Sequence, residues 1–106
     1  MALIVQKFGG TSVGNTDKIK AVAQRVLGCR NQGNQMVVVL SAMSGETDRL
    51  IGLARAVQRM PDLREMDMLV STGEQVTVSL FAMAVKEAGY DAVSLLGDQV
   101  SIQTTS

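Results

Sequence analysis

Apolar runs divide the first part of the chain into three predicted elements. Residues 2–8 are largely apolar, which is typical of a short strand in a parallel sheet that is covered on both faces. Between residues 17 and 28, apolar side chains recur every three or four positions and predict an amphipathic helix, with Thr16 or Asp17 as its cap. The β-branched run within residues 35–41 predicts a second buried strand. Strand, helix and strand in this order predict one βαβ unit.

Helical patterns dominate the next part of the chain. The apolar residues of segment 50–57 lie on one helical face, and the only proline, Pro61, then breaks the pattern. We expect a helix to resume over residues 65–70 and to end near Ser71. A longer helix is predicted for residues 73–88, where a glycine follows the last apolar positions.

Two extended segments complete the pattern and lead to a fold class. Residues 92–96 form a predicted third strand, and residues 100–106 begin another alternating segment for which the sequence identifies no partner strand. No internal repeat, low-complexity tract or linker divides the chain. We therefore expect residues 1–106 to form a single α/β piece, with a mostly parallel sheet and helices on both faces.

The composition favours a packed domain and argues against several classes of partner. The 106 residues are 46% hydrophobic, which suits a real interior. Ten Lys and Arg balance ten Asp and Glu, and without a basic tract we expect neither nucleic acid nor a membrane surface as a partner. No signal peptide or uninterrupted spanning stretch stands out, so the cytoplasm is the expected location. The lack of histidine argues against His-based triads and an ordinary zinc site, and no metal site is predicted.

A lysine and two glycines follow the first strand, at the edge where an open α/β sheet binds ligands. Glycines let backbone N–H groups approach an anion closely, and Lys7 supplies a mobile positive charge, so the segment suits a nucleoside triphosphate. Gly9 and Gly14 have the spacing of a Walker A loop, but Asn15 stands where that motif needs its lysine, and the only nearby cation in the sequence is Lys7. From spacing alone, a second interpretation stays open, in which Gly9 and Gly10 only form a tight turn and Lys7 is solvated.

Polar residues later in the chain also allow two interpretations. Ser41, Ser44 and Thr47 could satisfy turns and the first N–H groups of the following helix, with Thr47 as its N-cap. Residues 71–74 similarly match a capping box in which Glu74 reaches back to the serine. By residue type alone these structural roles are the more common ones. A carboxylate at this edge of the sheet could instead recognise the α-ammonium group of an amino acid.

The heptad Lys7-Phe8-Gly9-Gly10-Thr11-Ser12-Val13 closely resembles the opening signature of aspartate kinases, which belong to the amino-acid kinase superfamily. The resemblance continues through residues 38–47, 64–67 and 71–75 in the family's order and spacing, so it covers essentially the whole chain. It implies that Lys7 is the catalytic cation, and that the ATP-binding residues are Lys7, Phe8, Gly9, Gly10, Thr11 and Ser12. It also implies that Ser41 and Thr47 border the aspartate and phosphate sites, and that Glu74 binds the amino-acid substrate.

The same resemblance implies an activity. The γ-phosphoryl group of ATP, with Mg²⁺ carried by the nucleotide, would pass to the side-chain carboxylate of L-aspartate and give 4-phospho-L-aspartate, the first step toward lysine, threonine and methionine. The chain would be the N-terminal portion of a three-layer catalytic domain, with further catalytic residues, the base pocket and the regulatory ACT domains beyond Ser106. The full-length protein would be a homo-oligomer. A kinase for another amino acid and a non-enzymatic folding or association unit stay open as alternatives.

Overall fold

The computed structural model describes residues 2–95 and 99–102. Its elements are β1 (Leu3–Phe8), α1 (Thr16–Arg30), β2 (Gln35–Leu40), α2 (Glu46–Val57), α3 (Leu63–Glu87), β3 (Val93–Ser94) and β4 (Gln99–Ile102). Within the described residues, the sheet has the strand order β1-β2-β4-β3. Strands β1 and β2 are parallel, whereas β4 runs antiparallel to both β2 and β3. The predicted α/β class and the βαβ unit are confirmed. The last extended segment, for which the sequence identifies no partner, contains β4 and pairs with β2 and β3.

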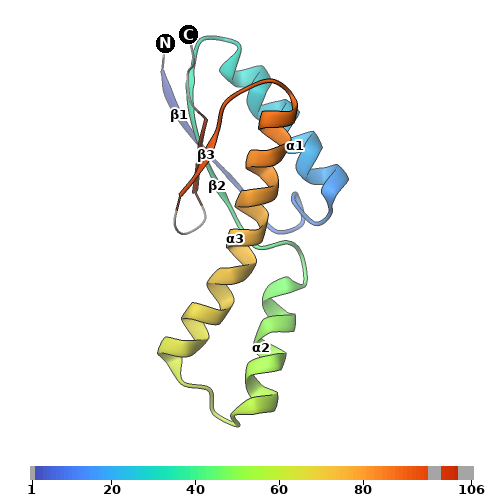
Figure 1. Ribbon diagram of the computed structural model, residues 1–106, viewed down its shortest axis with the longest axis vertical. Coiled ribbons are helices and arrows are strands. Elements are labelled where there is room, and N and C mark those ends of the chain that lie inside the picture. The colour runs from blue at the N-terminus through green and yellow to red at the C-terminus, as the bar shows by residue number, and fades with distance from the viewer. Residues whose placement is uncertain (1, 96–98, 103–106) are drawn as a thin grey trace.

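The core lies between the sheet and the two helices α1 and α3, which cover the same face of the sheet (Figure 1). Strand β2 turns every second side chain toward these helices, because side chains alternate between the faces of a strand. The fully buried residues of this core include Val26, Val38, Leu40, Phe81 and Val85. The predicted helical stripe of residues 17–28 is therefore confirmed as the buried face of α1.

The opposite face of the sheet is open in the described part of the chain. Leu3 and Val5 of β1 are 64% and 63% exposed, although both are apolar. The sequence predicts a sheet with helices on both faces, whereas the described helices α1 and α3 lie against one face (Figure 1). The described residues therefore leave apolar side chains of β1 uncovered.

The start of α1 differs from the predicted one. Asn15, and not Thr16 or Asp17, is the N-cap, and its side-chain oxygen accepts a 2.8 Å hydrogen bond from the backbone N–H of Lys18. Asn15 has the extended backbone that a cap requires, while Thr16 is already helical. The prediction of a cap at Thr16 or Asp17 is therefore wrong by one or two positions.

Helix α3 is continuous from Leu63 to Glu87, so the predicted break near Ser71 is wrong. The hydroxyls of Ser71 and Thr72, which suggested a new helix start, donate instead to the backbone carbonyls of Met68 and Leu69 at 2.8 and 2.7 Å. Such bonds to the preceding turn are the way in which hydroxyl side chains fit within a helix. The cap of α3 is Asp62, which accepts from the N–H of Glu65 at 3.0 Å.

Helix α2 packs beside the N-terminal part of α3, and the two extend away from the sheet as a helical hairpin (Figure 1). This projection gives the molecule its elongated dimensions of 51 × 24 × 18 Å. By length and composition alone, α3 is apolar enough to cross a membrane, with a mean hydropathy of 1.3. In this fold its C-terminal part is a core helix, since Val78, Phe81 and Val85 are buried.

The predicted third strand is shorter than expected, and Leu96 lies outside the described residues.

Candidate active site

Two loops meet at the edge of the sheet where β1 and β2 end. We call residues 9–15 the glycine loop and residues 41–45 the second loop. The backbone N–H of Ser41 donates to the carbonyl of Phe8, and that of Ser44 donates to the carbonyl of Gly10, both at 3.2 Å. The carboxyl ends of parallel strands meet at one edge of a sheet, and this edge is where open α/β folds bind ligands.

The glycine loop folds through two consecutive turns. The N–H groups of Ser12 and Val13 donate to the carbonyls of Gly9 and Gly10 at 3.1 and 3.3 Å, and the fully buried Val13 anchors the loop in the core. Within the described residues, the backbone N–H groups of Gly9, Gly10 and Thr11 donate to no backbone carbonyl. Successive backbone N–H groups in a turn that lack a carbonyl partner are suited to binding an anion. The Thr11 and Ser12 side chains are exposed beside it.

Lys7 and Phe8 occupy opposite faces of β1, as neighbours in a strand must. The Phe8 side chain is buried on the helix side, where the Arg25 guanidinium lies 5.6 Å from the centre of its ring. Any ligand contact from Phe8 therefore has to come from its main chain. The Lys7 side chain is exposed on the other face, and no carboxylate among the described residues pairs with it. Its ammonium is thus available to an anionic ligand.

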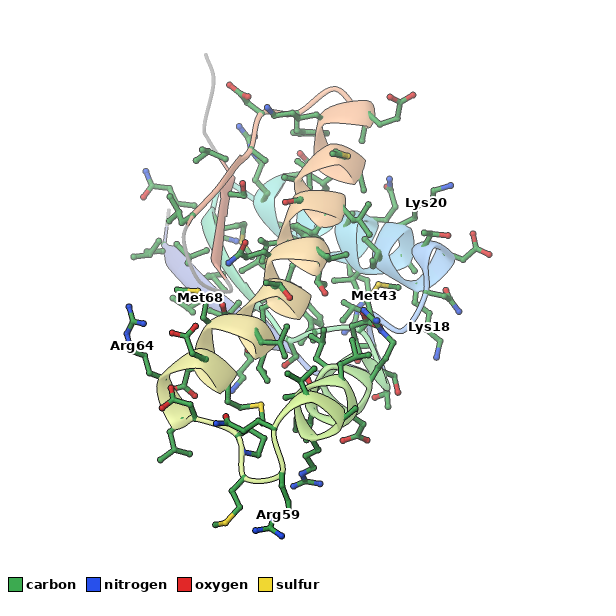
Figure 2. The ribbon with its side chains drawn as sticks, turned by 60° about the horizontal axis from the view of Figure 1, so that its bottom comes forward. Lys18, Lys20, Met43, Arg59, Arg64 and Met68 are labelled. Atoms are coloured by element: carbon green, nitrogen blue, oxygen red, sulfur yellow. The ribbon has the colours of Figure 1, made fainter. Side chains whose placement is uncertain are left out.

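A second cation reaches the glycine loop, which the sequence reasoning missed. The Lys18 ammonium donates a 3.2 Å hydrogen bond to the carbonyl of Thr11. Asn15 caps α1, so Lys18 lies in the first helical turn, close to the glycine loop. The interpretation of Lys7 as the only nearby cation is therefore wrong. Figure 2 shows that Lys18 and Lys20 both project from α1, far from Arg59 at the tip of the helical hairpin.

The second loop leads directly into α2. Gly45 has the left-handed backbone, with φ of 83°, and caps α2 without a side chain. The alternative role of Thr47 as N-cap is therefore wrong, because Thr47 already lies within the first turn of the helix. Ser41 is half-buried and Thr47 is exposed. Neither hydroxyl has a hydrogen-bond partner among the described residues, so both remain free for a ligand at this edge.

An ion pair lies in the first turn of α2. The Glu46 carboxylate accepts from two guanidinium nitrogens of Arg49, at 3.0 and 2.5 Å. This hydrogen bonding, together with the charge of Arg49, holds the pKa of Glu46 below its ordinary value and raises the pKa of Arg49. Glu46 therefore stays ionised near the positive end of the helix dipole.

Helix α3 passes the second loop at Gly73, and the next residue is Glu74. A Cβ atom at Gly73 would lie only 3.1 Å from the Cβ of Ala42, so helix and loop are in close contact there. Residues 71–74 lie inside α3, and the capping-box interpretation of Glu74 is therefore wrong. The half-buried Glu74 carboxylate is carried instead by a helix interior, one residue after the contact with the second loop.

The predicted site residues thus come from adjoining parts of the structure. Lys7, Phe8, Gly9, Gly10, Thr11 and Ser12 end β1 and form the glycine loop, Ser41 and Thr47 flank the second loop, and Glu74 lies on α3. Within residues 2–95 and 99–102, no group of three or more Asp, Glu, His or Cys side chains could hold a metal ion.

Residues 2–105 match the model of the family described as "Amino acid kinase family". The chain belongs to this family. It is 57% identical to aspartokinase 2 of Bacillus subtilis over 104 residues, which are 98% of this chain and 26% of that protein. It is 58% identical to the aspartokinase of Pseudomonas aeruginosa over 106 residues, which are 100% of this chain and again 26% of the relative. The predicted resemblance to aspartate kinases is confirmed, and the chain spans about a quarter of the length of these relatives.

Solved structures agree with the sequence comparison. The aspartate kinase from Synechocystis superposes with a TM-score of 0.86 at 54% identity, over 88% of this chain and 16% of that chain. Aspartokinase III of E. coli, in complex with aspartate and ADP, superposes with a TM-score of 0.66 at 27% identity, over 85% of this chain and 30% of that one. The fold is therefore part of the amino-acid kinase fold.

Proposed function

We propose that this chain supplies the phosphate-binding and aspartate-binding edge of an aspartate kinase, which transfers the γ-phosphoryl group of ATP to the side-chain carboxylate of L-aspartate. The observation that carries the proposal is the contact between the glycine loop and the second loop, with free amides and an exposed Lys7 at the same edge. The similarity to aspartokinases over the whole chain supports the choice of aspartate over another amino acid.

The chemistry requires two anions to meet. Charge develops on the transferring oxygens, so preorganised positive potential is the main catalytic requirement. The Lys7 ammonium and the amides of Gly9 and Gly10 would bind the phosphate oxygens. The Lys18 ammonium, held at the carbonyl of Thr11, would add to the same potential. A carboxylate is already a nucleophile, so the reaction demands no strong general base, and a chain without histidine can perform its part.

Residues of the second loop, α2 and α3 would orient the substrate. In this proposal the Glu74 carboxylate binds the α-ammonium group of aspartate, while the hydroxyls of Ser41 and Thr47 donate to anionic oxygens of aspartate or phosphate. Mg²⁺ would arrive with ATP, because magnesium in kinases is commonly bound through substrate phosphates and keeps several waters. We place the enzyme in the cytoplasm as a homo-oligomer.

The test uses a chimera in which residues 1–106 replace the matching segment of Bacillus subtilis aspartokinase 2. We expect the chimera to form an acyl phosphate from ATP and aspartate, which hydroxylamine traps as a hydroxamate. Replacement of the carboxylate in Glu74→Gln should raise the KM for aspartate by roughly a hundredfold, with the KM for ATP nearly unchanged, because the charge partner of the α-ammonium group is lost. A chimera that folds but forms no acyl phosphate would contradict the proposal.

A second candidate function is a folding or association unit without activity of its own. The observation that favours it is the exposed apolar face of β1, where Leu3 and Val5 are more than half exposed. Calorimetry of the 106-residue chain with Mg-ATP and aspartate tests whether the site is self-sufficient. Ordered binding of both ligands would favour a self-sufficient site and contradict the association unit, whereas the absence of binding heat would favour an incomplete site.

A further inference from the structure

Ala42 of the second loop lies between two glycines that belong to different parts of the proposed site. It is buried, with 7% of its surface exposed. Its methyl group faces α3, because a Cβ built at Gly73 would stand 3.1 Å from the Ala42 Cβ. Its carbonyl oxygen faces the glycine loop, since a Cβ built at Gly10 would stand 2.9 Å from that oxygen. One alanine therefore separates α3 from the glycine loop.

Both contacts are too close to admit another carbon atom without movement. Ordinary contacts between carbon atoms are about 3.5–4.0 Å. The Ala42 methyl group has no rotamer to change, and the hydrogen bond from the Ser44 N–H to Gly10 ties the second loop to the glycine loop. A movement of Ala42 away from α3 would therefore disturb the contact between the second loop and the glycine loop. The other two neighbours of a Cβ at Gly73, the Leu50 Cδ1 atom at 3.4 Å and the Glu46 Cγ atom at 3.6 Å, belong to side chains with rotatable bonds.

Glycine is otherwise a poor choice at position 73. It lies inside α3, ten residues from the Leu63 end, where glycine is the least favourable residue except proline. Its backbone is ordinary helix, so no left-handed conformation requires glycine. What requires it is the approach of the helix to Ala42. The next residue is Glu74, so this contact also sets the distance between the Glu74 backbone and the glycine loop.

We propose that Gly73 and Ala42 are positioning residues, which hold the proposed aspartate-binding helix and the phosphate-binding loop at the separation that phosphoryl transfer requires. The proposal rests on the function proposed above and adds to it a pair of residues to which it assigns a spacing role and no substrate contact. Gly73→Ala would wedge α3 and the second loop apart by a few tenths of an ångström. Each half of the site would keep its own contacts, while the distance between the two reacting groups would change.

The test compares four forms of the aspartokinase 2 chimera: the unaltered protein, Gly73→Ala, Ala42→Gly, and the double variant. Gly73→Ala should lower kcat by about tenfold, because small misplacements of reacting groups are costly. The KM values for ATP and aspartate should stay within about threefold, since the binding contacts themselves survive. The double variant moves the methyl group to the other side of the contact, and its kcat should return to within about threefold of the unaltered chimera. Rates are expressed per ATP-binding site counted by calorimetry, so that a loss of folded protein does not count as a loss of turnover.

Gly52→Ala is the matched control, because Gly52 also lies inside a helix but has no atom within 4 Å of a Cβ built on it. Its kinetics should equal those of the unaltered chimera. A Gly73→Ala variant with undiminished kcat, or a double variant no faster than Gly73→Ala, would overturn the proposal. An inactive unaltered chimera would contradict the proposed function instead. In that case the unfolding midpoints of the four proteins test the contact between Gly73 and Ala42. A double variant whose midpoint returns to that of the unaltered chimera would support the contact, and a double variant whose loss equals the sum of the two single losses would overturn it.

Discussion

The backbone N–H of Ser44 donates a 3.2 Å hydrogen bond to the carbonyl oxygen of Gly10. This bond joins two loops that are more than thirty residues apart in the sequence and makes them one edge of the sheet. It occupies the Gly10 carbonyl, which also accepts from the N–H of Val13, while the N–H groups of Gly9, Gly10 and Thr11 donate to no backbone carbonyl among the described residues. Unpaired N–H groups in a turn favour an anionic ligand.

Gly10 and Gly9 should respond very differently to the same substitution. Gly10→Ala places a Cβ 2.9 Å from the Ala42 carbonyl oxygen, whereas Gly9→Ala meets nothing within 4 Å. We expect Gly10→Ala to lower the free energy of unfolding by about 1–3 kcal/mol, the usual cost of overpacking. Gly9→Ala should change it by less than about 0.5 kcal/mol. Urea denaturation of the two variants measures both, and equal midpoints would show that the two loops can separate freely.

The cap of α1 gives a second contrast. Asn15→Ala removes the oxygen that accepts from the Lys18 N–H at 2.8 Å and should cost about 1 kcal/mol of stability. Thr16→Ala is the control, since Thr16 is the first helical residue and its side chain makes no capping bond. Thermal unfolding of both variants checks the assignment. A larger loss for Thr16→Ala than for Asn15→Ala would contradict the observed cap.

The Glu46–Arg49 pair predicts a change of stability with pH. The pKa of the Glu46 carboxyl is held below its ordinary value, mainly by the hydrogen bond from Arg49. Its contribution should therefore be present above about pH 4.3, the ordinary glutamate pKa, and should disappear as the pH falls through the lowered pKa. Glu46→Gln should be less stable than the unaltered chain at neutral pH, and the difference should shrink in acid.

Arg49→Met is the matched variant for this prediction, because it removes the same hydrogen bond from the other side. Urea denaturation from about pH 7 down to about pH 3 should give the two variants the same flattened profile. A difference between Glu46→Gln and the unaltered chain that does not change with pH would show that the ion pair contributes nothing to stability.

Local patterns in the sequence were sufficient for β1, β2 and the buried stripe of α1, because side-chain periodicity directly reflects which face is covered. These patterns failed where a specific contact in the fold outweighs the local preference of the residues for a helix start. Ser71, Thr72 and Gly73 carry the signals of a helix start, yet the hydroxyls bond back to the preceding turn and the glycine serves a contact with Ala42. The cap at Asn15 was missed because Thr16 and Asp17 are equally good caps by residue type.

Part of the candidate site could likewise be predicted from the sequence, and part could not. The meeting of the two loops follows from the parallel order of β1 and β2, which the sequence predicts. The contribution of Lys18 does not follow from any motif, because it depends on the register of α1 relative to the loop and on a hydrogen bond to a backbone carbonyl. The spacing between Gly10, Ala42 and Gly73 is likewise a property of three segments distant in sequence. Such contacts become visible only when the fold is known.

Lys7→Ala in the aspartokinase 2 chimera is the most direct test of the central claim, which is that the Lys7 ammonium stabilises the charge of the transferring phosphoryl group. We expect kcat to fall by at least about a hundredfold, with the KM for aspartate almost unchanged, because the lost interaction acts mainly in the transition state. Lys20→Ala, which removes an exposed cation of α1, is the control and should keep its full turnover. A Lys7→Ala chimera that retains the turnover of the Lys20→Ala control would contradict the account.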